Sequence, residues 1–227
     1  MGKRTLKVYA LEEGAVVVMQ AKGLKQIVPV VLAALAGAVL VAMPARAQFS
    51  DSYKFLEAVK KQDGQAVTDY LNEPGTTIVN TRDITSGDSA LHIVTQRRDV
   101  AWIRFLIAKG ADPNLQNTKG VTPLGLAVGV GFIEGAQALL DAGARVDDAS
   151  QTGETPLITA VHRRDVAIVR ALLKAGANPD RADNSGRSAR DYAALDGPSS
   201  QVLSAIESAD KQEKRQQAPQ KVYGPSF

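Results

Sequence analysis

The chain has 227 residues, of which 44% are hydrophobic and 22% are charged, as in ordinary soluble globular proteins. It has no cysteine, which excludes structural disulfides, thiolate zinc sites and cysteine nucleophiles. Six of the 27 Lys and Arg and two of the 24 Asp and Glu lie in residues 1–47, so the formal charge of +3 becomes −1 in the residues that follow. A strongly basic nucleic-acid-binding domain is therefore not expected.

Residues 1–47 contain the pattern of a secretory leader. Two lysines that follow Met19 precede an uncharged apolar stretch, residues 27–43, and a small-x-small sequence ends at Ala47. The pattern predicts a signal peptide that starts at Met19, is cleaved after Ala47 and releases a periplasmic protein beginning at Gln48. An uncleaved anchor is the alternative, because this apolar stretch has about the minimum length that spans a bilayer.

Two short apolar segments, residues 55–59 and 66–71, predict a pair of helices at the start of the exported part. Further along, two sequences recur with a step of 33 residues. One is Gly-x-Thr-Pro-Leu and the other is Gly-Ala followed by polar residues and proline or valine. The full copies lie at 120–124 and 153–157 for the first, and at 110–114, 143–147 and 176–180 for the second. Their common period defines three repeats, residues 84–116, 117–149 and 150–182.

Each recurring residue has a physical role at a helix end. Thr122 and Thr155 are predicted N-caps, whose hydroxyls accept from amides of the first turn. The proline after each threonine suits the first helical position, where an N–H group has no partner in the helix. Gly110, Gly143 and Gly176 follow a helix end, where a left-handed backbone favours glycine. Each repeat is therefore predicted to be a short helix, a turn and a second helix.

These residues resemble the ankyrin repeat, which opens with Gly-x-Thr-Pro-Leu-His-x-Ala and closes with Gly-Ala-Asp-x-Asn. His92 keeps the histidine of the opening sequence, whereas Gly125 and Ile158 take its place in the next two repeats. The resemblance implies an all-α ankyrin-repeat solenoid, in which helix-turn-helix units with short hairpin-like loops stack on one another. It also implies binding to another protein as the function.

The ends of the repeat array are predicted caps. The leading cap, residues 52–83, is predicted to carry a two-residue insertion, because Leu71 and Leu106 are 35 residues apart, and we place this insertion within residues 72–75. The terminal cap, residues 183–209, has Arg190 where the family usually has a buried leucine, which a unit with a single neighbour tolerates. Residues 210–227 are polar and mixed in charge, and they predict a tail that is disordered after a helical start.

The two histidines are predicted to be structural or surface residues. The resemblance places His92 at the start of a first helix, bonded to neighbouring backbone, and His162 at the exposed end of an inner helix. We expect no serine or carboxylate to orient His162, as a catalytic triad would require. The two histidines are also too far apart for a shared metal. We therefore predict no catalytic residue, no metal site, no cofactor and no enzymatic activity.

The resemblance assigns partner contacts to the hairpin tips and to the ends of the inner helices. The residues at these positions are Thr85, Ser86, Asp88, Gln96, Arg97, Thr118, Lys119, Val121, Val130, Gln151, Thr152, Glu154, His162, Arg163, Asn184 and Arg187. Two arginine pairs, 97–98 and 163–164, are two repeats apart and should lie on one side of the stack. Either they only keep the stack soluble, or they form an electropositive band that steers an acidic partner.

The sequence therefore predicts an exported interaction module that binds a periplasmic protein through its concave face and loop tips. Two alternatives stay open: a membrane-tethered periplasmic scaffold, if the leader is retained, and an accessory factor of a periplasmic enzyme. We expect no nucleic-acid partner, and contact with a membrane only through an uncleaved leader.

Overall fold

The computed structural model describes residues 50–197 and 199–217, which belong to a single unit of the chain. The predicted leader, residues 1–47, and residues 218–227 of the predicted tail lie outside the described residues. Among the residues described, secondary structure consists of ten α-helices and a short 3-10 helix. Among the described residues, no helix combines the length with the hydrophobicity that a membrane span requires.

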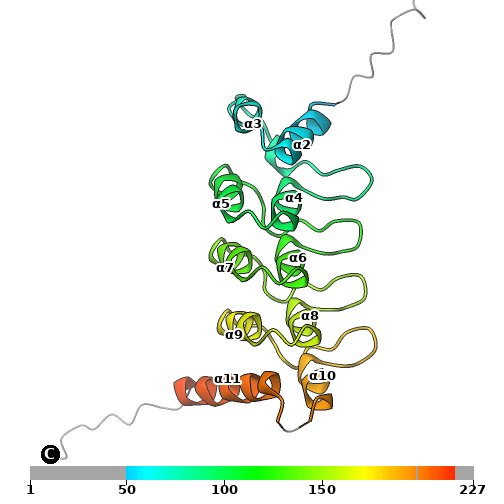
Figure 1. Ribbon diagram of the computed structural model, residues 1–227, viewed down its shortest axis with the longest axis vertical. Helices are drawn as coiled ribbons and strands as arrows, with labels where there is room; N and C mark the ends of the chain where they lie inside the picture. Colours follow the sequence, from blue (N-terminus) through cyan, green and yellow to red (C-terminus); the bar gives the residue numbers. More distant parts are fainter. Residues whose placement is uncertain (1–49, 198, 218–227) are drawn as a thin grey trace, which may run out of the picture. The chain divides into compact units, whose positions relative to one another are not determined.

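The α-helices form five consecutive pairs that stack on one another (Figure 1). The first members of the pairs make an inner column: α2 (Asp51–Lys61), α4 (Ala90–Gln96), α6 (Pro123–Gly129), α8 (Pro156–His162) and α10 (Ala189–Leu195). The second members make an outer column: α3 (Gly64–Leu71), α5 (Val100–Ala108), α7 (Ile133–Asp141), α9 (Val166–Lys174) and α11 (Gln201–Gln217). The 3-10 helix η1 (Ile78–Asn80) follows α3. The prediction of an all-α solenoid of helix-turn-helix units is confirmed.

Helix starts and stops follow the recurring residues. Thr122 Oγ1 accepts from the Gly125 amide at 3.1 Å, and Thr155 Oγ1 accepts from the Ile158 amide at 3.2 Å, with proline at the first helical position in both cases. The three predicted stop glycines have left-handed backbones, with φ of 88°, 84° and 89°. The predicted caps and stops are confirmed, and the capping explains why these short helices begin where they do.

The core lies between the two columns and continues from one pair to the next. Leu124 and Leu157 of the inner column and Leu139 and Leu172 of the outer column are all fully buried, at 0% exposure. Aliphatic side chains dominate this core, as the low aromatic content of 5% requires. Since a single helix pair cannot enclose such residues, each pair depends on its neighbours for burial.

The loops that project beyond the inner column are hydrogen-bonded to one another. Thr118 N donates to Ser86 O at 2.9 Å, and Gln151 N donates to Lys119 O at 3.1 Å. Gly120 has a φ of 72°, and a Cβ atom there would lie 2.8 Å from Gln151 N. Glycine is therefore required both by the left-handed backbone and by the close approach of the next loop.

The first hairpin shows that the leading insertion was misplaced. Asp83 N donates to Asp88 O at 2.9 Å, which closes six residues, whereas Asn117 N donates to Val121 O at 3.0 Å and closes only five. The N-caps Asp63 and Asp99 are 36 residues apart, so the leading unit has three extra residues rather than the predicted two. At least one of them lies in this hairpin, so placing the whole insertion within residues 72–75 was wrong. A loop tip accepts an additional residue without disturbing the core, and Ile84 at this tip is fully exposed.

The last helix extends into the predicted tail. Because α11 continues to Gln217, the helical start that was expected for the tail covers residues 210–217. Lysine, glutamine and arginine in this segment are good helix formers despite their polarity. In addition, Arg190 Nη1 donates to Asp210 Oδ2 at 2.9 Å, which holds the segment to α10.

Candidate protein-interaction site

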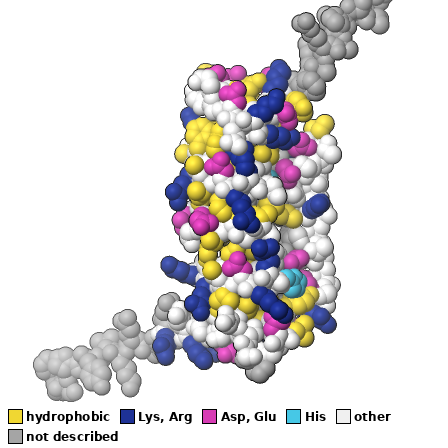
Figure 2. All heavy atoms as spheres, in the orientation of Figure 1, with side chains coloured by type: hydrophobic (Ala, Val, Ile, Leu, Met, Phe, Trp, Pro, Cys, Tyr) yellow, Lys and Arg dark blue, Asp and Glu magenta, His cyan; other side chains and the backbone are white. Residues whose placement is uncertain are grey.

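The predicted contact residues lie at the hairpin tips and at the ends of the inner helices. Figure 2 shows one face of the stack, on which basic, acidic and hydrophobic side chains are intermingled. The exposed members of the predicted set are Thr85, Gln96, Thr118, Lys119, Gln151, Thr152, His162, Arg163, Asn184 and Arg187. The half-buried members are Ser86, Asp88, Arg97, Val121, Val130 and Glu154.

Several hairpin-tip residues bind the neighbouring loop. Thr118 Oγ1 donates to Ser86 O at 2.7 Å, Gln151 Nε2 donates to Thr118 O at 2.8 Å, and Asn184 Nδ2 donates to Gln151 O at 3.0 Å. These side chains hold consecutive tips at a fixed spacing. The side chain of Lys119, in contrast, has no hydrogen bond or ion pair within the described part of the chain and extends into solvent.

His92 has the structural role that was predicted for it. Its Nδ1 accepts from the Ser89 amide at 3.2 Å, so Nε2 carries the proton and donates to Val121 O in the next hairpin at 2.9 Å. The ring is buried at 1% exposure, and this burial lowers the pKa of His92 below its usual value of 6.5. His92 therefore links one helix start to the following loop as a neutral imidazole.

His162 has a carboxylate neighbour, contrary to the prediction. Its Nδ1 lies 3.3 Å from Glu154 Oε1, and Thr159 Oγ1 donates to the same oxygen at 2.9 Å. The His162 ring also meets the Tyr192 ring edge-on, with centroids 4.4 Å apart. Glu154 stands just before the start of α8 and His162 at its end, so their long side chains meet along two helical turns.

The exposure and the contacts of His162 differ from those of a histidine in a catalytic triad. The side chains of His162 and Glu154 are 46% and 34% exposed, so water screens their interaction. Within the residues described, the imidazole contacts no serine or threonine hydroxyl that it could activate. The cluster instead presents an imidazole at the end of α8 beside an aromatic ring from the middle of α10.

Two of the four paired arginines are neutralised within the stack. Arg97 donates to Val59 O at 2.9 Å and forms an ion pair with Asp99 at 3.3 Å. Arg164 Nε donates to Asp196 Oδ2 at 3.1 Å. Arg97 therefore reaches the preceding helix pair and Arg164 the following one, and both connect neighbouring units.

The other two arginines bind backbone oxygens without a carboxylate. Arg163 Nη1 donates to Gly129 O at 2.8 Å, and Arg98 Nη2 donates to Val130 O. Gly131 has a φ of 65°, and a Cβ atom there would lie 2.4 Å from Arg163 Nη2, so a larger residue would force this guanidinium to move. The four arginines are thus not equivalent. Of the predicted electropositive band, only Arg98 and Arg163 have no carboxylate partner among the described residues.

Two exposed side chains and one half-buried side chain near this face were missed from the sequence. Ile84 at the first hairpin tip and Leu195 at the end of α10 are 101% and 71% exposed, and Tyr192 packs beside His162. Continuing the repeat period into the terminal cap would have found two of them, since Tyr192 and Leu195 follow Thr159 and His162 by 33 residues.

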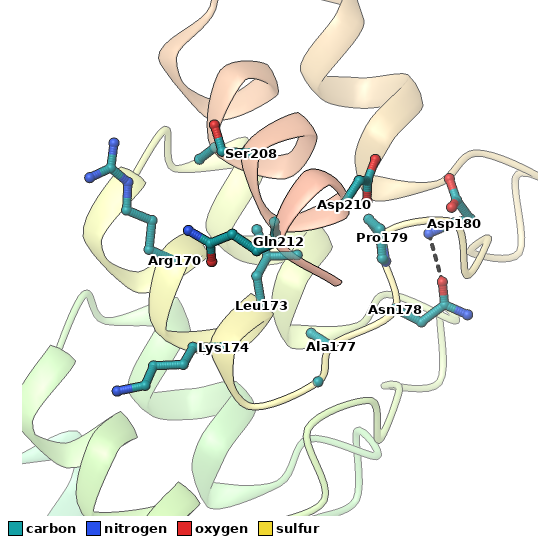
Figure 3. A pocket seen from close by; sticks show the side chains of 13 residues that line it. Arg170, Leu173, Lys174, Ala177, Asn178, Pro179, Asp180, Ser208, Asp210 and Gln212 are labelled. Atoms are coloured by element: carbon teal, nitrogen blue, oxygen red, sulfur yellow. Dashed lines mark hydrogen bonds between the residues drawn. The ribbon is translucent and has the colours of Figure 1, made fainter. Parts of the chain in front are cut away.

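A cleft of about 900 Å³ lies on the other side of the stack, between α9 and α11. In Figure 3, Arg170 and Lys174 extend from α9, and Ser208 and Gln212 line the cleft from α11. Its lining mixes cations, Asp180, Asp210 and small neutral residues, which gives no consistent preference for one ligand. Within the part of the chain that the structure describes, no cluster of three metal-ligating side chains occurs.

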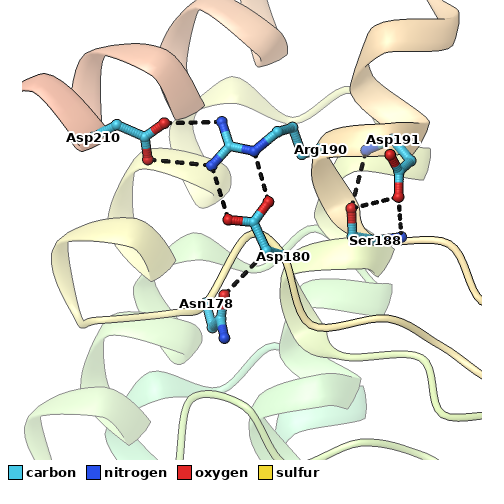
Figure 4. A network of polar contacts seen from close by, with 6 residues as sticks. All are labelled: Asn178, Asp180, Ser188, Arg190, Asp191 and Asp210. Atoms are coloured by element: carbon cyan, nitrogen blue, oxygen red, sulfur yellow. Dashed lines mark hydrogen bonds and ion pairs between the residues drawn. The ribbon is translucent and has the colours of Figure 1, made fainter.

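Arg190 connects the two aspartates at the edge of this cleft (Figure 4). Its guanidinium lies 2.7 Å from Asp180 and 2.9 Å from Asp210, and the pKa of Asp180 is lowered because Arg190 donates to its carboxylate. The residue that replaces a usual leucine is therefore an anchor for α11 rather than merely a tolerated substitution.

Comparison with known proteins places this geometry in a family. A model described as ankyrin repeats (3 copies) matches residues 55–150, and one described as ankyrin repeats (many copies) matches residues 139–193. A 51-residue segment is 45% identical to the nuclear factor NF-kappa-B p110 subunit of Drosophila melanogaster, and covers 22% of this chain and 5% of that protein. Another segment, of 66 residues, is 36% identical to a transient receptor potential cation channel subfamily A member 1 homolog of Caenorhabditis elegans. It covers 29% of this chain and 6% of that protein. The chain thus spans a small part of the length of these relatives.

Proposed function

The chain belongs to the ankyrin-repeat family, and we propose that it works as a protein–protein interaction module without catalytic activity of its own. The observation that carries this proposal is the stack itself, in which polar chemistry is used for capping and for bonds between repeats. Exposed side chains remain at the ends of the inner helices and at the hairpin tips, among them Gln96, His162 and Lys119. Such a surface, rigid and built from many independent positions, is suited to recognising another folded protein.

The proposed contact surface is the inner-column face, which we define by the ends of the inner helices and the hairpin tips beside them. Gln96, His162 and Arg163 are exposed at the helix ends, and Thr85 and Lys119 are exposed at the tips. His162 and Tyr192 add ring surface, which is enriched in protein interfaces. The partner is proposed to be acidic, because two guanidinium groups on this face have no carboxylate partner among the described residues.

We propose that the partner is met in the periplasm. The support for this is the leader pattern, in which a basic start, an apolar stretch at residues 27–43 and a cleavage sequence at Ala47 follow in order. Mass spectrometry of the chain recovered from cells tests the proposal. A protein that starts at Gln48 supports export and release, whereas one that retains residues 27–43 supports the tethered scaffold.

Photo-crosslinking in cells tests the contact surface. A photoreactive amino acid at Gln96 or His162 is expected to give discrete adducts with a partner protein. The same group at Gln137, which is exposed on α7 of the outer column, is the matched control and is expected to give none. Adducts at Gln137 with none at the inner positions would contradict the proposed surface.

A further inference from the structure

Arg98 and Arg163 approach one stretch of backbone from opposite directions along the stack. Arg98 follows α4 and donates to Val130 O, whereas Arg163 follows α8 and donates to Gly129 O at 2.8 Å. The two acceptors are carbonyls of consecutive residues at the end of α6. Since each bond fixes one end of a guanidinium, the two groups converge on the end of this helix.

The C-terminal carbonyls of α6 hold the guanidinium groups but do not neutralise them. Carbonyl oxygens at a helix C-terminus attract cations through a partial negative charge only. Across residues 50–197 and 199–217, neither Arg98 nor Arg163 forms an ion pair with a carboxylate, whereas Arg97 and Arg164 both do. A guanidinium has five N–H donors, and one such bond leaves the others for a ligand.

The backbone between the two arginines is open to solvent. Gly129 occupies the position that Gln96 and His162 hold in the neighbouring repeats, and it is exposed, with no atom within 4 Å of the place of a Cβ. An incoming group therefore meets no side chain at this position. The repeat that contains α6 thus leaves a gap over Gly129, where it has no side chain. The repeats on either side supply the two charged guanidinium groups.

We propose that Arg98 and Arg163 form a carboxylate clamp that binds an acidic side chain of the partner protein at the gap over Gly129. The inference rests on the proposed function, and it specifies which groups select the partner. Two like charges that converge without a counter-ion repel each other, and an anion bound between them removes this repulsion. Planar guanidinium groups also match a carboxylate in a paired arrangement of two hydrogen bonds.

Peptides selected for binding to the chain test the clamp. Random peptides displayed on phage are selected on the purified chain, and the peptides recovered are sequenced and synthesised. Each is then titrated against the chain and against the double variant Arg98→Gln/Arg163→Gln, which removes both charges. Glutamine suits the backbone here, because Gln62 has the same left-handed conformation at the equivalent turn, with φ of 60° beside 59° for Arg98.

The matched control is Arg104→Gln/Arg170→Gln, which removes two exposed charges from α5 and α9 in the outer column. Selected peptides are expected to be enriched in Asp and Glu. The clamp variant should bind them about tenfold more weakly or worse, with a smaller dependence of affinity on salt. The outer-column variant should bind them within about twofold of the unchanged chain.

The outcomes separate the clamp from the broader function. If peptides are enriched without acidic residues, or if acidic peptides bind the clamp variant as tightly as the unchanged chain, the clamp is refuted and the interaction module stands. If no peptide is enriched at all, the interaction module is refuted together with the clamp. Replacing each acidic residue of a bound peptide by its amide supplies a test that needs no protein variant. A DNA duplex that binds as tightly as the peptides would contradict a protein ligand.

Discussion

Replacing Gly120 by alanine tests whether consecutive hairpins pack against each other. The matched change is Gly143→Ala, since both glycines are left-handed, with φ of 72° and 84°. A Cβ at Gly143 meets nothing within 4 Å, so that variant bears only the backbone cost, about 1–2 kcal/mol. A Cβ at Gly120 would lie 2.8 Å from Gln151 N, so the next loop must move away.

That movement breaks hydrogen bonds between two repeats. Gln151 N donates to Lys119 O at 3.1 Å, and Gln151 Nε2 donates to Thr118 O at 2.8 Å. Each such bond contributes about 1 kcal/mol net. Gly120→Ala is therefore expected to lower the free energy of unfolding by about 2–4 kcal/mol in total, which is about 1–2 kcal/mol more than Gly143→Ala.

Urea unfolding followed by far-UV circular dichroism measures the difference between the two variants. Hydrogen exchange gives a local check, because the Gln151 amide should lose protection in Gly120→Ala and keep it in Gly143→Ala. Equal losses of stability, within about 0.5 kcal/mol, would show that the loops do not pack as described.

Three other predictions concern the core, the buried histidine and the last helix. Leu139→Ala and Leu172→Ala should each cost about 2–5 kcal/mol in urea unfolding, because both side chains are fully buried. Burial keeps the pKa of His92 below 6.5, so the unfolded chain takes up its proton first as the pH falls. The contribution of neutral His92 to the free energy of unfolding should therefore be fully present above pH 6.5 and be lost as the pH falls below it. This loss of stability should be smaller in His92→Gln. Arg190→Ala should cost at most about 1 kcal/mol, since its partners are partly exposed, and should speed hydrogen exchange in α11.

Each of these predictions has a result that would contradict it. Losses below about 1 kcal/mol at both leucines would refute the repeat register. An equal decrease of stability between pH 7 and pH 5.5 in the unchanged chain and in His92→Gln would assign the pH dependence to other groups. Aspartates with lowered pKa values are not among them, because they change stability only below about pH 4. Exchange in α11 that is unchanged by Arg190→Ala would mean that the arginine does not anchor this helix.

The repeating architecture could be predicted because its signals are local. A threonine followed by proline starts a helix, and a glycine with a left-handed backbone ends one, whatever surrounds them. Thr122 and Thr155 both cap as predicted, and the spacing of 33 residues between them fixes the register of the stack. The additional hairpin residue near Ile84 escaped because loop tips carry no such local signal.

Contacts between repeats could not be predicted, since periodicity gives a position but not the direction of a side chain. Arg97 and Arg98 are adjacent, yet they reach opposite neighbours, because Arg98 has a φ of 59° and turns the chain. The same reversal separates Arg163 from Arg164. The sequence therefore located the arginines but did not show which charges would be neutralised.

The His162 cluster was missed for a related reason. Glu154 was considered as a hairpin residue and His162 as a helix end, and eight positions separate them. The short helix between them brings both to one face, which only the structure shows. The helical extension to Gln217 depends likewise on a partner distant in sequence, Arg190.

Hydrogen exchange with a bound peptide shows whether the inner-column face is the binding surface. The tightest peptide from the selection is added to the chain, and protection is compared between the two columns of the stack. We expect slower exchange at the ends of α4, α6 and α8 and in the hairpin tips, and unchanged exchange in α5, α7 and α9. Protection confined to the outer column, or to the cleft beside α11, would contradict it.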